Sequence, residues 1–337
     1  MVSEPDTGRP PTIRTVAARA GVSKSLVSLV LKNSPHVSEV KRQAVLKAVA
    51  ELSYRPDPVA RSLAERRTRT VGIVIDDLSN PWYTPLLDGL RPVLHEHGLR
   101  PLLADGRTEP DAVRALADLR VDGLVLVGTP SASAVEQVDA LGNHMPTVVA
   151  GTRDPRLSAV DLVANDDYSG AQLATGHLLG LGHRRIAHIV GEGEVGRLRR
   201  AGHEASITEA GLEARCVAGD WTEPTGHRVA AELLRGPDRP TAIFAANDLS
   251  AVGVLSAADE LGLRIPEDLS VVGYDDTWFA RLKRLSLTTV NGHIAEVGQV
   301  AARTLIARIE GTGGTAGVRL LFPVLVERSS TGPAPVR

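Results

Sequence analysis

Apolar residues recur at helical spacing on both sides of Gly21, in the stretch TIRTVAARAGVSKSLVSLVLKN. Thr12 and Ser23 stand where a side-chain oxygen can cap a helix, and Gly21 can adopt the positive φ of a tight turn. Ala17 is small where two helices must approach closely, and the residues expected to form a shared core are Val16, Val22, Val27 and Val30. The pattern therefore predicts a short helix around residues 16–20, a turn, and a second helix to about Lys32.

Two further helical patterns follow this helix-turn-helix. In SPHVSEVKRQAVLKAVAELSYRP, Ser38 is a candidate cap, and the apolar stripe consists of Val40, Ala44, Val45, Ala48 and Leu52. In RPDPVARSLAERRTRT, Asp57 can cap and Pro58 can open a helix of about two turns. So short a helix is marginal alone in water, so we expect it to form when it meets DNA and a second copy of itself. An ordinary linker is the alternative.

From Val71 onward, short apolar runs alternate with helical stretches. The runs expected to form strands are 71–75, 100–104, 123–127, 146–150, 185–190, 242–246 and 270–274. Such alternation is typical of parallel sheets with helices on both faces. Because there are more of these strand-helix units than a single sheet usually holds, we expect two similar Rossmann-like lobes.

Charge is distributed unevenly along the chain. Residues 1–70 hold 13 Lys and Arg against 6 Asp and Glu, whereas residues 71–337 hold 25 against 34. A basic N-terminal segment indicates a polyanion partner, which the acidic remainder would repel. A solvated basic tail is the alternative, and the ordered helical pattern argues against it.

Composition excludes several classes of protein. Cys216 is the only cysteine, which rules out a disulfide framework and a cysteine-rich zinc site and suits a reducing compartment. No apolar run approaches the roughly 18 residues of a membrane span, and the start MVSEPDTGRPPT lacks a signal-peptide pattern. We therefore expect a cytoplasmic protein.

Further motifs occur in one order along the body: DDLSNPWY, LGHRRIAHI, GDWTEPTG, PTAIFAANDLSAVG, DLSVVGYDDT and VLVERSST. Together with the N-terminal stretch, they make nearly the whole chain resemble the LacI/GalR (lactose-repressor) family of bacterial transcription regulators. The resemblance implies an all-α helix-turn-helix head and an α/β body of the periplasmic-binding-protein type. It also implies a homodimeric repressor that binds a near-palindromic operator and responds to a small effector.

The resemblance also implies a division of the chain. The head is expected at 1–56, a hinge helix and linker at 57–69, and the two-lobed effector-binding and dimerisation body at 70–337. The first lobe would comprise about 70–165 and 292–322, and the second about 166–291 and 323–330. The chain would cross between lobes near Asn165, Asn291 and Phe322, which places a helix at 294–310 on the first lobe.

The second helix of the head would enter the major groove of the operator. By the resemblance, the DNA-binding residues are Thr15, Ser23, Lys24, Ser25, Ser28, Leu29, His36, Tyr54 and, as a minor-groove wedge, Leu63. Leu29 departs from the family, because many members carry there an arginine that reads guanine. We expect Leu29 to be exposed and to pack on a thymine methyl group. The alternative is that Leu29 packs in the core of the head. Leu26 could be exposed or buried.

Polar and aromatic residues follow several of the expected strands. Asp275 and Asn247 can hold sugar hydroxyls, Arg199 can donate to a diol, and Trp221 can stack on a sugar ring or a purine. The resemblance assigns these four to the effector site, and Trp82 and Tyr83 are further cleft-lining candidates. Taken singly, Asp275 could instead cap a helix, Asn247 could fix a turn and Trp221 could simply pack.

Other functions have little support. GEGEVG (191–196) matches a dinucleotide fingerprint, but its two glutamates would repel a pyrophosphate, so an NAD-dependent enzyme is disfavoured. HEH (95–97) lacks metal-ligand spacing, and no nucleophile motif occurs, so we expect no catalytic residue, metal or cofactor. We expect a sugar to release the repressor from DNA. A purine that tightens DNA binding, or a sugar-binding uptake protein, are the alternatives.

Overall fold

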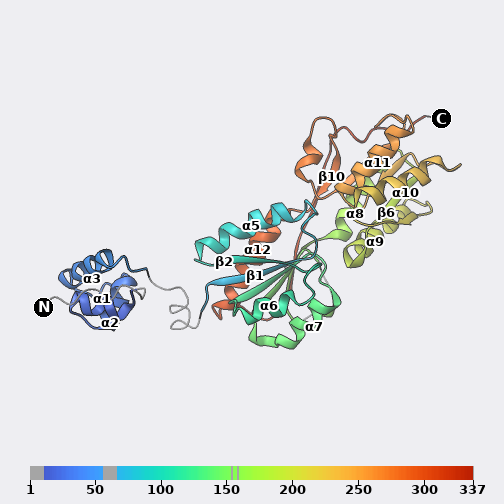
Figure 1. The fold of residues 1–337 in the computed structure, drawn as a ribbon. Coiled ribbons are helices and arrows are strands. Elements are labelled where there is room, and N and C mark those ends of the chain that lie inside the picture. Colours follow the sequence, from blue (N-terminus) through green and yellow to red (C-terminus); the bar gives the residue numbers. More distant parts are fainter. Residues whose placement is uncertain (1–10, 56–66, 153–154, 158, 337) are drawn as a thin grey trace. The chain divides into compact units, whose positions relative to one another are not determined.

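The structure is a computed structural model that describes residues 11–55, 67–152, 155–157 and 159–336. Its contacts divide the chain into two compact units, 1–68 and 69–337 (Figure 1). Most of the expected hinge helix, including Leu63, lies outside the described residues.

The first unit contains the expected helix-turn-helix. Helices α1 (Ile13–Ala20), α2 (Lys24–Leu31) and α3 (Glu39–Glu51) follow one another (Figure 1). Thr12 caps α1, Ser23 caps α2 through the amide of Leu26, and Gly21 has a φ of 65°. The buried core consists of Val16, Ala17, Val27, Val30, Val37, Val45 and Ala48. The all-α head is thus confirmed.

Helix α3 departs from expectation in two respects. Val40, expected on the buried stripe, is 83% exposed. At about 100° per residue it lies roughly 110° around the helix from the midpoint of Val45 and Ala48, which do face the core. Ser38 precedes the helix, but its side chain makes no capping hydrogen bond within the described residues.

The second unit consists of two lobes, each built on a six-stranded sheet (Figure 1). The first lobe contains β1 (Thr70–Ile75), α5 (Tyr83–Glu96), β2 (Arg100–Asp105), α6 (Ala112–Asp118), β3 (Gly123–Val127), α7 (Ala132–Leu141), β4 (Thr147–Ala150), β5 (Asp161–Asn165), α12 (Ile294–Ile309) and β11 (Val318–Leu321). The second contains α8 (Asp167–Gly180), β6 (Ile186–Val190), α9 (Gly193–Glu209), β7 (Arg215–Ala218), α10 (Glu223–Arg235), β8 (Ala242–Phe244), α11 (Asp248–Glu260), β9 (Ser270–Tyr274), β10 (Thr288–Asn291) and β12 (Val324–Val326). Short 3-10 helices lie at Gly142–His144, Pro155–Leu157 and Trp278–Arg281.

The strand orders are β11-β5-β4-β3-β1-β2 and β12-β10-β9-β8-β6-β7. Neighbouring strands are parallel except β12, which runs antiparallel to β10. Two Rossmann-like lobes are therefore confirmed. All seven expected runs form strands, with ends shifted by a residue or two, whereas β5, β7, β10, β11 and β12 were not anticipated.

The chain passes between the two sheets three times. It leaves the first sheet after β5, returns after β10, and crosses again between β11 and β12. Helix α12 thereby packs on α5 of the first lobe at very close range. A Cβ atom at Gly89 would overlap the backbone of Ala295, and one at Gly298 would overlap the backbone of Leu86. Only glycine at these two positions allows this approach.

Within the described ranges, no helix is long and apolar enough to cross a membrane. The same residues contain no group of three or more His, Cys, Asp or Glu side chains that could hold a metal ion.

Candidate functional site

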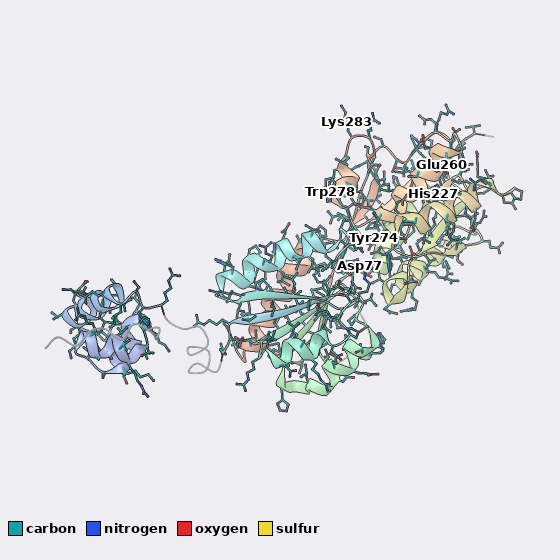
Figure 2. All side chains as sticks on the ribbon, viewed as in Figure 1. Asp77, His227, Glu260, Tyr274, Trp278 and Lys283 are labelled. Carbon is teal, nitrogen blue, oxygen red and sulfur yellow. The ribbon has the colours of Figure 1, made fainter. Side chains whose placement is uncertain are left out.

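A cavity lies where the carboxyl ends of strands in the two lobes face each other, which is the usual ligand position in such folds. Its lining residues are Asp76, Asp77, Asn80, Trp82, Tyr83, Gly128, Thr129, Gly151, Asn165, Val195, Arg199, Trp221, Asn247 and Asp275. The structure thus brings together all six residues that the sequence singled out for a ligand. Asp77 of the first lobe and Tyr274 of the second are labelled near this junction in Figure 2.

Arg199 on α9 is the central cation of this cavity and is only 4% exposed. Its Nε donates to Asp167 Oδ1 at 2.9 Å, and one terminal nitrogen donates to the carbonyl oxygen of Ala246 at 2.6 Å. The other terminal nitrogen lies 3.5 Å from Asp275 Oδ1. Burial alone would lower the pKa of Arg199, but the two carboxylates outweigh burial and raise it. The guanidinium is therefore a fixed, permanently charged donor.

Two aromatic rings pack against Arg199. The guanidinium carbon lies 3.4 Å from the ring centroid of Tyr274 and 5.4 Å from that of Trp221. Tyr274 is fully buried, and its hydroxyl accepts a hydrogen bond from Asn165 Nδ2 at 3.0 Å. Stacking on aromatic faces and the fork of donors together fix the guanidinium plane.

Asp275 follows β9 and has a φ of 111°, a strained backbone conformation for a residue with a side chain. Burial raises the pKa of its carboxyl well above the ordinary value, and Arg199 beside it only partly opposes this shift. The following 3-10 helix begins after Thr277, so Asp275 does not occupy its capping position.

Asn247 follows β8 and is 1% exposed. Its Oδ1 accepts from the amide of Ser250 at 2.8 Å and so caps α11, while its Nδ2 donates to the carbonyl oxygen of Trp221 at 3.2 Å. The turn-fixing interpretation of Asn247 therefore agrees with these contacts. Through the second bond, Asn247 also holds the loop that carries Trp221.

Two tryptophans lie against glycines. A Cβ at Gly151 would overlap the ring of Trp82, and a Cβ at Gly191 would overlap the ring of Trp221. Asn80 Oδ1 accepts from the amide of Trp82 at 3.0 Å, which fixes the start of α5. The ring of Trp82 meets that of Tyr83 edge to face, with centroids 5.1 Å apart. The cavity thus has flat apolar surfaces beside charged groups.

Three carboxylates of this site, namely Asp76, Asp77 and Asp167, were not singled out from the sequence. Asp167 follows β5 and pairs with Arg199, and Asp76 follows β1 and lines the cavity. Asp76 Oδ2 accepts from the amide of Thr129 at 2.8 Å, whereas its Oδ1 has no hydrogen-bond partner among the described residues. Burial, with Asp77 beside it, raises the pKa of Asp76 to about 6. The available signal was a pair of aspartates directly after a buried strand.

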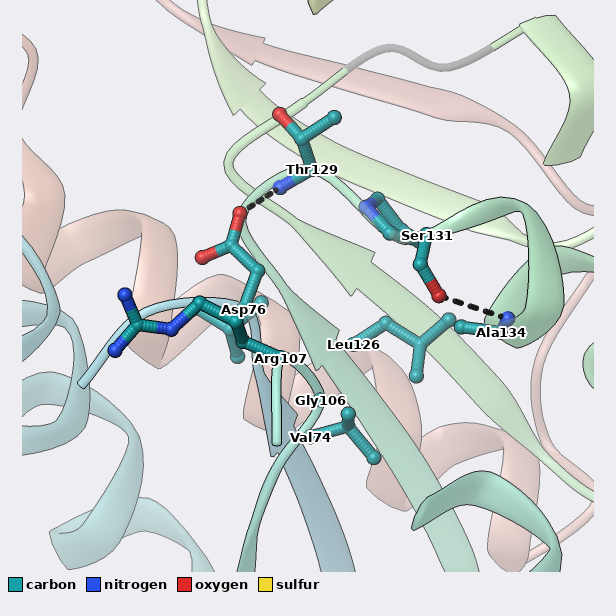
Figure 3. A pocket seen from close by; sticks show the side chains of 10 residues that line it. Val74, Asp76, Gly106, Arg107, Leu126, Thr129, Ser131 and Ala134 are labelled. Carbon is teal, nitrogen blue, oxygen red and sulfur yellow. Dashed lines mark hydrogen bonds between the residues drawn. The ribbon is translucent and has the colours of Figure 1, made fainter. Parts of the chain in front are cut away.

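A second cavity adjoins the first within lobe one (Figure 3). Its lining residues are Val74, Asp76, Gly106, Arg107, Leu126, Val127, Thr129, Pro130, Ser131 and Ala134. Asp76 and Thr129 line both cavities, and Figure 3 shows the hydrogen bond between them.

The candidate DNA-binding residues of the head occupy different positions. Lys24, Ser25, Leu29 and His36 have exposed side chains, and Leu29 is 42% exposed. The hydroxyls of Thr15 and Ser23 take part in helix caps, Ser28 is half-buried, and Tyr54 packs against the head core. Leu26 also packs partly on that core, while Leu63 lies outside the described residues.

Comparisons with known proteins cover both units. Residues 12–57 match the family described as bacterial regulatory proteins, lacI family, and residues 175–331 match a periplasmic binding protein-like domain. The chain is 34% identical over 335 residues to the HTH-type transcriptional repressor PurR of Erwinia tasmaniensis, covering 97% of this chain and 98% of that repressor.

Solved structures give the same picture. The lac repressor dimer bound to operator and the anti-inducer ONPF has a TM-score of 0.86 and 30% identity, with 96% of this chain and 100% of that chain covered. The transcriptional regulator CelR in complex with cellobiose has a TM-score of 0.73 and 33% identity, with 95% and 99% covered.

Proposed function

The chain belongs to the lacI family of bacterial regulatory proteins, and we propose on that premise that a small sugar releases it from its operator. It is a transcriptional repressor of that family and not an enzyme. We further propose that it acts as a homodimer on a near-palindromic operator in the cytoplasm. The boundaries expected for its head, hinge and lobes belong to the same proposal.

The observation that carries the sugar proposal is the cavity between the lobes. Trp82 and Trp221 offer flat apolar faces, as sugar rings require, and Arg199 and Asp275 supply a donor and an acceptor for hydroxyl groups. The cellobiose complex of CelR, which is similar over nearly the whole chain, adds support for a saccharide ligand.

A purine that tightens operator binding is the second candidate. The similarity to PurR favours it, and the same tryptophans would stack on a purine as well as on a sugar.

The mechanism follows from where the ligand binds. Its contacts come from both lobes, so it favours one lobe arrangement over the other. If operator DNA favours the other arrangement, the effector weakens DNA binding, and DNA weakens effector binding by the same factor. The hinge segment around 58–64 is our candidate for the element that carries this coupling to the DNA.

Operator titrations test the proposal. An operator is first selected from random DNA with the full-length protein, and its binding is then followed by fluorescence anisotropy with cellobiose, D-glucose, hypoxanthine or guanine. We expect a saccharide to weaken operator binding at least about tenfold, equivalent to about 1.4 kcal/mol. The Trp221→Ala variant should bind the operator normally and ignore the saccharide. Tighter binding with a purine alone would overturn the sugar assignment.

Leu29 should set base preference within the operator. Its exposed side chain can contact a thymine methyl group but cannot donate a hydrogen bond to guanine. We expect Leu29→Ala to weaken operator binding by about 1 kcal/mol and to relax selection at one base pair, and Leu29→Arg to favour G·C there. Selection from randomised operators measures both effects.

Val40→Ala is the matched control, because Val40 is an exposed apolar residue on another helix of the head. Its selected operators should equal those of the parent protein. An invariant G·C pair in the parent's operators that Leu29→Ala loses would contradict the assigned role of Leu29.

A further inference from the structure

The carboxylate of Asp76 stands in the wall shared by the two cavities. One oxygen is held by the amide of Thr129, and the other is buried without a hydrogen-bond partner in the described part of the chain. A buried acceptor without a partner is costly, so such groups generally mark places where water or a ligand completes the bonding. Figure 3 shows this arrangement, with one oxygen bonded and the other apart.

Gly128 keeps the neighbourhood of this carboxylate open. A Cβ at Gly128 would lie 2.5 and 2.6 Å from the two carboxylate oxygens of Asp76 and would overlap the hydroxyl of Tyr83. With a φ of 87°, this position also suits glycine best. Because Gly128 has no side chain, the loop after β3 leaves room for the Asp76 carboxylate and the Tyr83 hydroxyl beside it.

The charges around the cavity are unbalanced. Three of its lining residues are aspartates (Asp76, Asp77 and Asp275), and the cation among them is Arg199, which already donates to Asp167 and Ala246. Asp77 has Arg107 at 3.3 Å. No described Lys or Arg lies within ion-pair distance of Asp76. An anionic ligand group would meet uncompensated negative charge there, whereas a hydroxyl or ammonium group would supply the missing donor.

We propose that Asp76 is a specificity-determining residue of the effector site, where it accepts a hydrogen bond from a hydroxyl or ammonium group and excludes effectors that present phosphate or carboxylate. This inference rests on the proposed saccharide response and names the chemical class of saccharide. The exclusion of anions separates it from general sugar binding.

Calorimetric titration of the full-length protein tests this role, with cellobiose, D-glucose, D-glucosamine and D-glucose 6-phosphate as probes. At pH 7.5 we expect a neutral or aminated saccharide to bind and the phosphate to bind at least about tenfold more weakly than D-glucose. Asp76→Asn should weaken the binding of the neutral sugar about tenfold. It should also reduce the ratio of the affinity for D-glucose to the affinity for D-glucose 6-phosphate. Asp88→Asn, which changes an exposed carboxylate of α5 outside both cavities, is the control.

The pH profile gives a readout that a purely structural role would not change. The groups facing Asp76 are Asp77, Tyr83, Thr129 and Arg107, with Arg199 and Asp275 lining the same cavity from the other lobe. Because the donor stabilises ionised Asp76, sugar affinity should be constant well above pH 6. It should fall as the pH drops below 6, where the free carboxyl gains a proton. The Asp76→Asn variant should show a smaller fall than the parent, because it keeps only the contribution of Asp275, whose pKa burial also raises.

Four results would contradict the proposed role of Asp76. A saccharide that binds Asp76→Asn and the parent equally, or the phosphate as tightly as D-glucose, would overturn the role of Asp76 while leaving the proposed function intact. Failure of every saccharide to bind the parent would overturn the proposed function and this inference with it. If Asp76→Asn does not fold, the parent's own profile decides, because constant affinity from pH 5 to 7.5 contradicts the proposal.

Discussion

Replacing Arg199 by methionine should lower the free energy of unfolding by about 3 to 5 kcal/mol, because two buried carboxylates then lose their cation. Methionine fills a similar volume, so the loss reports mainly charge and hydrogen bonds. Asp167, 2.9 Å from the guanidinium, is 2% exposed and cannot regain full hydration. Denaturant unfolding at pH 7.5, followed by circular dichroism, measures the change. The variant should also lose its response to a saccharide.

The control for this change is Arg197→Met on the same helix. Arg197 is exposed and pairs only with Glu194 in the described structure, so the control should cost less than about 1 kcal/mol. Adding Asp167→Asn to Arg199→Met should restore part of the stability, since it removes one uncompensated charge. If the free energy of unfolding of Arg199→Met lies within about 1 kcal/mol of the parent's, the ion pairs of Arg199 with Asp167 and Asp275 do not stabilise the fold.

Acid should destabilise the second lobe through His203. This residue is fully buried on α9, its Nδ1 lies 2.9 Å from the hydroxyl of Thr175, and burial lowers its pKa from 6.5 to about 4. The folded protein therefore resists protonation that the unfolded chain accepts. The contribution of His203 is fully present above pH 6.5 and is lost as the pH falls to 4, by about 3 kcal/mol in total.

Comparing the parent with His203→Gln isolates the contribution of His203 to the free energy of unfolding. Carboxyl groups with raised pKa values, such as Asp76 and Asp248, titrate in both proteins. We expect the parent to be the more stable at pH 7.5 and its advantage to shrink steadily toward pH 4. His95→Gln, at an exposed position, should leave the pH dependence of unfolding unchanged. Parallel stability curves for the parent and His203→Gln would exclude a proton-linked role for the buried imidazole.

The sequence was sufficient for strands that are continuous and apolar. VGIVI and GLVLV have the composition of strands covered on both faces, and both are interior strands of the first sheet, with a neighbour on each side. The strands TTVN and VRLL were missed because they are four residues long and mix apolar with polar residues. They are strands because neighbouring strands supply their backbone partners, which local composition does not reveal.

The candidate site divides in the same way. Arg199 and Trp221 could be named because their residue types, in segments that follow strands, suit a polyhydroxylated ligand, and the resemblance marked the same positions. Asp167 could not be named as the partner of Arg199, because only the fold brings the start of α8 against α9. Asp76 and Asp77 are adjacent in sequence, and nothing local distinguishes the carboxylate that a cation holds from the one left without a partner.

The late return of α12 to the first lobe affects how the protein is made. A ribosome releases β1 to β5 long before it releases α12, whose Val297, Ala301 and Leu305 belong to the core that the helix completes against β3, β4 and β5. Until then, α5 covers only part of that face of the sheet, and the place that α12 takes beside it is empty. Both sheets gain their outermost strands, β11 and β12, within a few residues of each other. A chain terminated before α12 would therefore have a complete helix-turn-helix head and an incomplete two-lobed body. The exposed apolar surface of that body would be open to chaperones and proteases.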